Sequence, residues 1–197
     1  TGNDFPKVTE GIIDCKESAS TLRLTIPVAA ITGERVTFTG RGGLCRRPLG
    51  IYLKIFDEQN IEYTAKDGEL PLTFAGRLTF GEYRVRGDIS SQFISGLLLA
   101  LPLLKGDSKI VISGVMESKG YIDLTLDVMN KFSVVVENRN YNEFVVKGNQ
   151  KYIPGCHRVE GDFSQGAFWL AAGLLGDEVF CRGLEANSLQ GDKAILE

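Results

Sequence analysis

Small polar residues gather where an apolar helical stretch of this sequence is expected to begin. Ser90, Ser91 and Gln92 follow Gly87 and Asp88 and precede a long apolar run. A helix N-terminus offers free backbone N–H groups and the positive end of the helix dipole, which suit a phosphate or a carboxylate. Two hydroxyls and one amide add hydrogen-bond donors. We therefore expect an anion to bind here, with plain N-capping of the helix as the alternative.

Two other helix starts carry similar residues. Ser18, Ser20 and Arg23 occupy the equivalent place in the first apolar stretch, and Ser118 and Tyr121 flank the start of a later helix. Each set could cap its helix or bind a ligand.

Two arginines stand directly before a proline. Arg46 and Arg47 precede Pro48, and this order predicts the first turn of a helix. An arginine there can bind a phosphate through two parallel hydrogen bonds. A solvated corner is the alternative interpretation.

The sequence indicates no familiar catalytic set. The single histidine, His157, follows Pro154, Gly155 and Cys156 and is expected in a surface turn. Because there is no other histidine, no Ser-His-Asp triad can be assembled. Five carboxylates could act as acids or bases, but nothing in the sequence pairs them: Glu10, Asp14, Asp88, Asp123 and Asp162.

Composition excludes several classes of protein. The chain has 197 residues, is 43% hydrophobic and carries a net charge of −3, so it can bury a core but lacks the basic surplus of a nucleic-acid or anionic-membrane binder. Its longest apolar run, residues 97–104, is far shorter than the ~20 residues of a membrane span. Four scattered cysteines indicate buried thiols in a reducing cytoplasm, with no zinc site: Cys15, Cys45, Cys156 and Cys181.

One pattern occurs three times along the chain. An acidic residue and a serine precede an apolar helical stretch, a glycine, and an alternating strand that ends in glycine. The copies span residues 17–40, 88–114 and 162–183. An amphipathic helix and a hairpin follow each of the first two copies, with turns AKDGEL and ENRNYN. We predict an α/β fold of repeated helix, strand, helix, strand, strand units, each of roughly seventy residues.

The third copy is shorter than the others. It reaches Glu197 just inside its second helix, and the hairpin that should follow is missing. We therefore expect the chain to be a piece of a longer protein, with a degenerate C-terminal cap as the alternative.

Several sequence strings together resemble one enzyme family. They are RRPLG, GDISSQFISGLLLALPLL, SKGYIDLTLDVM, VEGDFSQGAFWLAAGLL and NSLQGD, in the family's order. They are similar to the 5-enolpyruvylshikimate-3-phosphate synthases, or 3-phosphoshikimate 1-carboxyvinyltransferases. The resemblance implies two lobes of repeated units, with helices inside and sheets outside. Residues 1–158 would form one substrate-binding lobe lacking its first unit, and residues 159–197 would begin the return into the second lobe.

The resemblance also implies a reaction. The family moves the enolpyruvyl group of phosphoenolpyruvate to the 5-hydroxyl of shikimate 3-phosphate, through a tetrahedral adduct that expels phosphate, on the route to chorismate and aromatic amino acids. It implies a cytoplasmic enzyme with no metal, no organic cofactor and no nucleic-acid or membrane partner. The family's principal acid and base lie in the missing second lobe, so this chain alone is expected to be inactive and to contain no catalytic residue. By the family's pattern, shikimate 3-phosphate would be held by Ser90, Ser91, Gln92, Ser118 and Tyr121, and phosphoenolpyruvate by Ala19, Arg47 and Gln92.

One segment departs from the family's pattern. Ala19 stands where the family usually has glycine, and Lys16 stands where it often has glycine. Glycine lets a ligand approach the backbone closely, so the methyl group of Ala19 is expected to narrow the phosphoenolpyruvate site and weaken binding of glyphosate, which fills that site.

Two alternatives stay open from the sequence. The enolpyruvyl transferase that acts on UDP-N-acetylglucosamine shares the fold and chemistry, although the SSQ and SxxYID strings favour shikimate 3-phosphate. A non-catalytic repeat module that binds a partner protein is the second alternative. It predicts that Ser90, Ser91, Gln92 and Arg47 do not converge.

Overall fold

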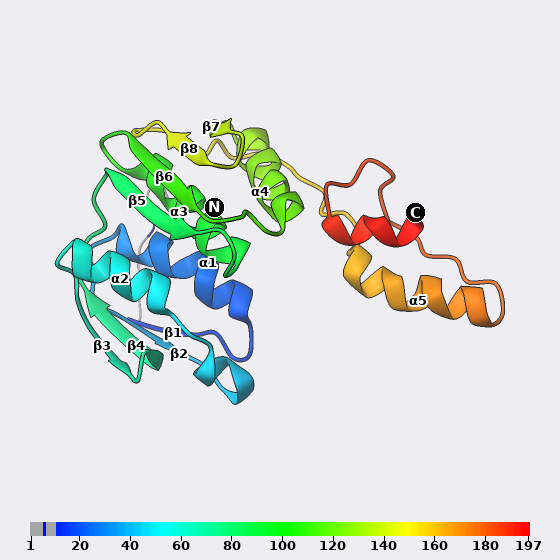
Figure 1. The fold of residues 1–197 in the computed structure, drawn as a ribbon, viewed down its shortest axis with the longest axis horizontal. Helices are drawn as coiled ribbons and strands as arrows, with labels where there is room; N and C mark the ends of the chain where they lie inside the picture. The colour runs from blue at the N-terminus through cyan, green and yellow to red at the C-terminus, as the bar shows by residue number, and fades with distance from the viewer. Residues whose placement is uncertain (1–5, 7–10) are drawn as a thin grey trace.

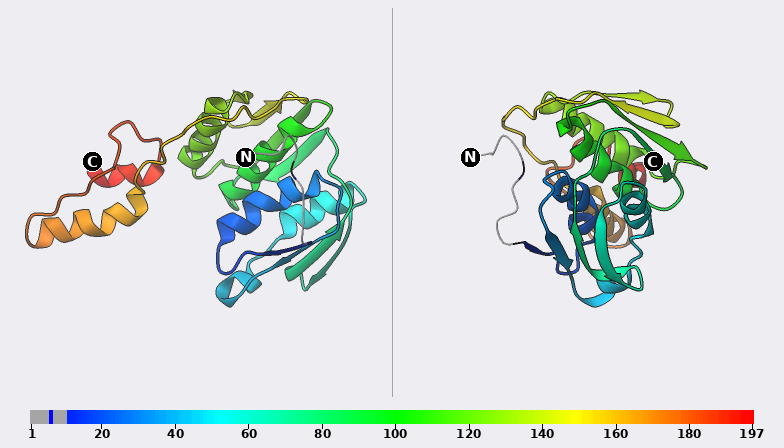
Figure 2. Two further views of the ribbon diagram at one scale, coloured as in Figure 1. Left: turned by 180° about the vertical axis from the view of Figure 1, so that it is seen from behind. Right: turned by 90° about the vertical axis from the view of Figure 1, so that its left-hand side faces the viewer.

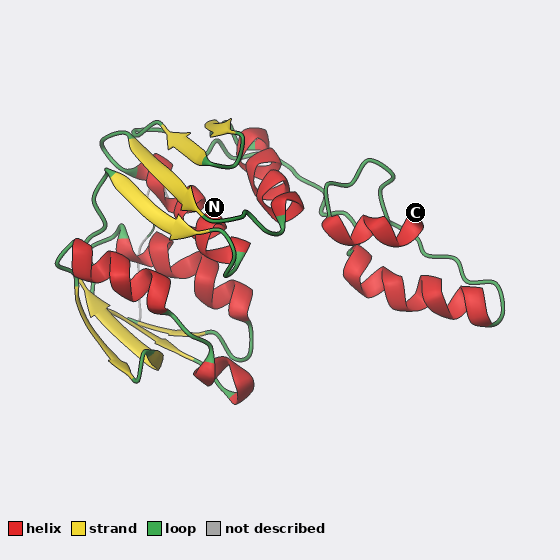
Figure 3. Ribbon diagram, viewed as in Figure 1, coloured by secondary structure: helices red, strands yellow, loops and turns green. Residues whose placement is uncertain are grey.

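Two four-stranded sheets enclose a layer of helices in the computed structural model, which describes residue 6 and residues 11–197 (Figures 1 and 3). Hydrophobic residues alternate along the strands, and the inward set forms the core together with the helices. The expected arrangement of helices inside and sheets outside is confirmed. The first sheet has the order β1 (Ile12–Asp14), β2 (Val36–Thr39), β4 (Glu69–Ala75) and β3 (Glu62–Lys66).

The second sheet repeats the topology of the first. In each sheet the first two strands pair in parallel and the last two form an antiparallel hairpin. The predicted repeat is confirmed, but each unit begins with a further strand, β1 or β5, that the sequence pattern did not indicate. The second sheet has the order β5 (Glu82–Arg86), β6 (Ser108–Ser113), β8 (Glu143–Val146) and β7 (Val136–Arg139).

The helices begin and end close to where the sequence predicts. In the first two units a serine caps the first helix, and a glycine follows the apolar stretch. Phe93, Ile94 and Leu97 are fully buried because the first helices lie between the sheets. The helices are α1 (Ala19–Ala30), α2 (Gly50–Glu58), α3 (Ser91–Ala100), α4 (Lys119–Lys131) and α5 (Phe163–Leu175).

A close contact fixes α1 against α3. Pro27 lies inside α1 and has no N–H, so the carbonyl of Arg23 loses its helical donor. The hydroxyl of Tyr52 on α2 donates to that carbonyl at 2.6 Å and reaches the carbonyl of Phe93 on α3 at 3.3 Å. Gly96 leaves room for this arrangement, because a Cβ there would lie 2.5 Å from both the Arg23 carbonyl and the Tyr52 hydroxyl.

The sequence prediction for the Arg-Arg-Pro segment was wrong. Arg46 ends a short 3-10 helix, η1 (Gly42–Arg46), and Arg47 is extended with ψ 123°. The residue before a proline avoids the helical region, and α2 begins only at Gly50. Arg47 therefore lies in a connection between η1 and α2.

The third copy forms its helix but lacks its strand. The strand expected over residues 177–183 is absent, which corrects the prediction. One backbone hydrogen bond, from Gly161 N to Gly183 O at 2.7 Å, matches those from Cys15 to Thr39 and from Gly87 to Ser113 in the other units. A strand needs neighbours to complete its ladder, and residues 184–197 contain no strand that could pair with this segment.

The end of the chain stands apart from the two sheets. Figure 2 shows α5 and the 3-10 helix η3 (Gly191–Leu196) beyond α4, connected by an extended segment. None of the helices in the described part of the chain combines the length and apolarity of a membrane-crossing segment. Phe163 is buried, whereas much of the apolar surface of α5 faces water.

Candidate functional site

The N-terminal ends of α1 and α3 form the centre of the candidate site. Ser18 caps α1, where its hydroxyl accepts a hydrogen bond from the amide of Thr21 at 3.1 Å. Ser90 caps α3 and accepts from the amide of Gln92 at 3.3 Å. Both serines are therefore caps, as the N-capping alternative predicts.

Arg23 joins the N-terminal ends of α1 and α3. Its Nη1 atom donates to Gln92 Oε1 at 3.1 Å and to Ser90 Oγ at 3.4 Å. The amide Nε2 of Gln92 donates in turn to Ser20 Oγ at 2.9 Å. Polar side chains 67 to 72 residues apart in the sequence thus form one connected network across the two repeats. We call these four residues, Ser20, Arg23, Ser90 and Gln92, the arginine network.

The Arg23 guanidinium is buried without a carboxylate. Its residue exposure is 8%, and no ion pair links it to an acidic side chain in the described part of the chain. Its Nε atom is buried and has no hydrogen-bond partner there, and the guanidinium stacks over Phe93 at 4.7 Å. Burial lowers the pKa of Arg23, and the nearby cation of Arg47 lowers it further. Arg47 is therefore near enough to disfavour the charge of Arg23, which joins the N-terminal ends of α1 and α3.

The other predicted residues of this region differ in exposure. Ser91 is buried, and its hydroxyl makes no hydrogen bond to another described residue. Arg47 is exposed, close enough to Arg23 to affect its charge. Ala19, the first residue of α1, is half-buried and packs against the hydrophobic core. Its expected effect on a ligand stays a prediction.

Ser118 and Tyr121 lie at the start of α4. Ser118 has a left-handed backbone with φ 54° and makes no capping hydrogen bond. The neighbouring amide of Glu117 donates to the carbonyl of Gly87, which holds this loop against the approach to α3. The hydroxyl of Tyr121 instead donates to the carboxylate of Asp192 in η3. The structure therefore connects Tyr121 with the end of the chain and not with the arginine network.

Two hollows adjoin these residues. A cavity of about 860 Å³ lies between α4 and residues 157–190, with Tyr121, Asp162 and Gln190 in its wall. A groove of about 430 Å³ lies between the start of α2 and the second sheet, with Pro48 and Phe93 in its wall. The groove reaches Phe93, the ring over which Arg23 stacks.

The candidate acids and bases do not form pairs. Asp88 binds Arg86 at 2.6 Å, Asp123 accepts from the hydroxyl of Tyr141 at 2.7 Å, and Asp162 caps α5. Asp14 accepts from the amide of Lys16, and Glu10 lies outside the described residues. Each described carboxylate has a local structural partner, so none is marked as an acid or base by this chain alone.

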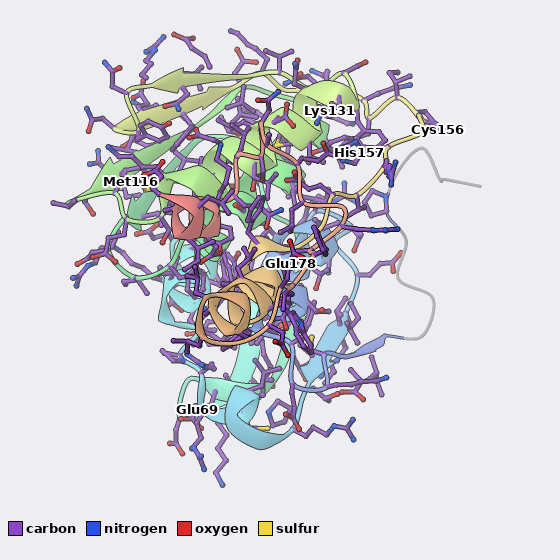
Figure 4. The ribbon with its side chains drawn as sticks, turned by 90° about the vertical axis from the view of Figure 1, so that its right-hand side faces the viewer. Glu69, Met116, Lys131, Cys156, His157 and Glu178 are labelled. Atoms are coloured by element: carbon purple, nitrogen blue, oxygen red, sulfur yellow. The ribbon has the colours of Figure 1, made fainter. Side chains whose placement is uncertain are left out.

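His157 lies at the surface, as the sequence predicts. It is exposed, its ring contacts Phe132 edge to face, and Figure 4 shows it near the end of α4 with Cys156 on the outside of the molecule. This exposure agrees with a surface role. The prediction of buried thiols is confirmed for Cys15 but is wrong for Cys156, which is exposed in the same surface segment as His157.

Sequence reasoning did not find the residues that hold the network in place. Tyr52 and Gly96 resemble ordinary core residues in the sequence, although both contact the carbonyl of Arg23. Pro27 within an apolar helical stretch was the available signal, because a proline there frees the carbonyl four residues earlier.

Comparison with known proteins identifies the family. Residues 1–197 match EPSP synthase (3-phosphoshikimate 1-carboxyvinyltransferase). A protein of that name from Clostridium novyi is 55% identical over 185 residues, covering 94% of this chain and 42% of its own length. One from Clostridium kluyveri is 53% identical over 195 residues, covering 99% of this chain and 46% of its own length. This chain therefore spans less than half the length of these relatives.

The fold is similar to a solved structure as well. An EPSP synthase from Acinetobacter baumannii superimposes with a TM-score of 0.67 at 20% identity, over 82% of this chain and 36% of the other. At that identity the likeness concerns the fold alone. The sequence match over every residue confirms the resemblance found in the sequence strings, and the chain belongs to the EPSP synthase (3-phosphoshikimate 1-carboxyvinyltransferase) family.

Proposed function

We propose that this chain is part of an enzyme that transfers the enolpyruvyl group of phosphoenolpyruvate to the 5-hydroxyl of shikimate 3-phosphate. The 5-hydroxyl loses its proton and its oxygen bonds to the central carbon of phosphoenolpyruvate, while the methylene carbon gains a proton and becomes a methyl group. The tetrahedral adduct then loses phosphate, and the methyl group loses a proton to restore the double bond. The chain alone is expected to be inactive, because it spans less than half of its relatives.

A single observation carries this proposal. Arg23 is a buried cation without a described carboxylate, lies at the junction of two helix N-termini, and its charge is further disfavoured by Arg47. A buried charge is costly unless an opposite charge compensates it, and helix N-termini favour anions. Both substrates carry a phosphate and a carboxylate, so either could supply the missing negative charge.

The assignment of residues to substrates follows the family's pattern. Ser90, Ser91, Gln92, Ser118 and Tyr121 would bind shikimate 3-phosphate, and Ala19, Arg47 and Gln92 would bind phosphoenolpyruvate. Tyr121 could take part only after it leaves Asp192 or shares its hydroxyl with the ligand.

The proposal extends to the organisation of the complete protein. Residues 1–158 would be a substrate-binding lobe, and residues 159–197 would lead into a second lobe of the same chain that closes over the ligands. We place the enzyme in the cytoplasm, which the four free cysteines support because disulfides are rare there.

Calorimetric titration with shikimate 3-phosphate tests the binding site directly. We expect saturable binding near ~1 mM, or about −4 kcal/mol, since half of a two-lobed site contributes. Replacing Ser90 and Ser91 together by alanine should abolish it. Ser164→Ala, at the start of α5, is the matched control and should bind as before.

The full-length protein then tests the reaction. Phosphate release from phosphoenolpyruvate should require shikimate 3-phosphate and should not occur with UDP-N-acetylglucosamine. The proposal fails if neither acceptor supports release, and release with the nucleotide sugar alone would establish the other transferase.

A further inference from the structure

We infer that Arg23 is a positioning residue that turns the hydrogen-bond donors of Ser20, Ser90 and Gln92 toward a bound anion. This inference rests on the proposed function and adds a role for a residue to which the family's pattern gave none. Arg23 is buried under the network, with a residue exposure of 8%, whereas Ser20 is exposed. It acts through its neighbours.

The side-chain amide of Gln92 has a fixed direction. A guanidinium only donates hydrogen bonds, so the atom of Gln92 that faces Arg23 must be the carbonyl oxygen Oε1. The amide nitrogen therefore points the other way, where one of its two protons binds Ser20 Oγ. The second proton is available to an anionic ligand. Without Arg23, the amide could rotate and present its oxygen, which an anion repels.

The hydroxyls of Ser90 and Ser20 are also oriented by the hydrogen bonds that their oxygen atoms accept. Ser90 Oγ accepts from Arg23 Nη1 and from the backbone amide of Gln92. Ser20 Oγ accepts from the Gln92 amide. Neither hydroxyl proton has an acceptor among the described residues, so both protons remain to be donated. The exposed side of the arginine network thus offers the hydroxyl protons of Ser20 and Ser90 and one amide proton of Gln92 to a ligand.

A purely structural role does not explain this arrangement. A buried arginine that stabilises the fold would have its donors satisfied, whereas Arg23 Nε has no partner and Arg47 disfavours its charge. Its removal should therefore cost function and leave the folded state as stable as before or more stable.

A double-mutant cycle in the full-length protein tests the inference. The four proteins carry no change, Arg23→Met, Gln92→Ala, or both. We expect Arg23→Met to lower kcat/KM for phosphoenolpyruvate about tenfold or more without lowering the melting temperature. In the Gln92→Ala background, the same change should cost less than about threefold, because its effect passes largely through Gln92. Arg139→Met, an exposed arginine paired with Glu137, is the control and should change nothing.

Two results would overturn the inference. Equal losses in both backgrounds would show that Arg23 acts directly on the ligand, and a lower melting temperature accompanying the loss would show a structural role. Nuclear magnetic resonance of the 197-residue chain gives a readout independent of activity. The Gln92 side-chain amide signals, assigned by their loss in Gln92→Ala, should shift in Arg23→Met. Unchanged signals would refute the positioning role even if the full-length protein has a different activity.

Discussion

Among single residues, Tyr121 differs from the other site candidates because a described side chain already binds its hydroxyl. The hydrogen bond to Asp192 is the largest cause that raises the pKa of Tyr121 to about 12, and partial burial adds to it. The raised pKa favours the protonated phenol in the folded chain. Stability from this group is therefore complete below the ordinary tyrosine pKa of ~10 and declines as the pH rises toward about 12.

Titration of the phenolate absorbance checks this contact. The contribution of Tyr121, obtained by difference from Tyr121→Phe, should appear near pH 12. Asp192→Asn should move it down toward the ordinary value, because an amide oxygen accepts a weaker hydrogen bond from the phenol than a carboxylate does and carries no charge to repel a phenolate. Asp177→Asn, an exposed aspartate elsewhere in the same segment, should leave it in place. A titration near the ordinary value in the unaltered chain would mean that η3 does not rest on α4.

Residue types alone predicted part of the site. The sequence indicated Ser90 as a cap and Ser18 at the equivalent place, and both cap their helices. It could not show that Arg23 lacks a carboxylate or that it reaches Gln92, because both facts depend on how two distant helices pack. The local hydrogen-bonding preference of serine acts within a few residues, whereas an ion pair can come from anywhere in the chain.

At the scale of elements, the packing of α1 against α3 depends on the absence of a side chain. A methyl group at Gly96 would meet the carbonyl of Arg23 and the hydroxyl of Tyr52 at 2.5 Å, and the carbonyl belongs to the backbone and cannot turn away. Because Tyr52 satisfies the carbonyl that Pro27 leaves free, displacing it would also leave a buried acceptor without its donor.

Unfolding in urea should therefore distinguish an alanine substitution at Gly96 from one at Gly50. Gly96→Ala should lower the free energy of unfolding by about 1–3 kcal/mol or more, through overpacking and the lost hydrogen bond. Gly50→Ala is the matched control, since it is also helical and a Cβ there meets nothing within 4 Å. It should instead raise stability by up to about 1 kcal/mol from helix propensity. A harmless Gly96→Ala would mean that the two helices are not held at this distance.

The elements themselves were predicted well where their signals are local. Apolar periodicity, serine caps and the Asp67-Gly68 turn gave the first two units. The prediction omitted β1 and β5, which join their sheets only through parallel pairing to a distant strand. It included a strand at residues 177–183 that the structure lacks, since an alternating pattern forms a strand only when a neighbour completes the ladder.

For the whole molecule, α5 is the element whose sequence and surroundings disagree. Its sequence is strongly apolar, yet Phe168, Trp169 and Leu175 are 75%, 64% and 91% exposed. Burying one such side chain stabilises a protein by about 1.5–3 kcal/mol, so a helix with several of them favours a partner surface. The relatives extend well beyond the length of this chain, and we propose that the remaining part covers α5.

The single tryptophan makes this testable, because Trp169 lies on the exposed face of α5. In the dilute 197-residue chain its fluorescence should resemble that of an indole in water and should be quenched by iodide. In the full-length protein, the emission that Trp169→Phe removes should lie at shorter wavelength and resist quenching, because the covering part excludes water. Self-association would reveal itself as a blue shift that grows with concentration of the short chain. Shielding that is already complete in the dilute short chain would contradict the proposal, since α5 would then have found its partner within these residues.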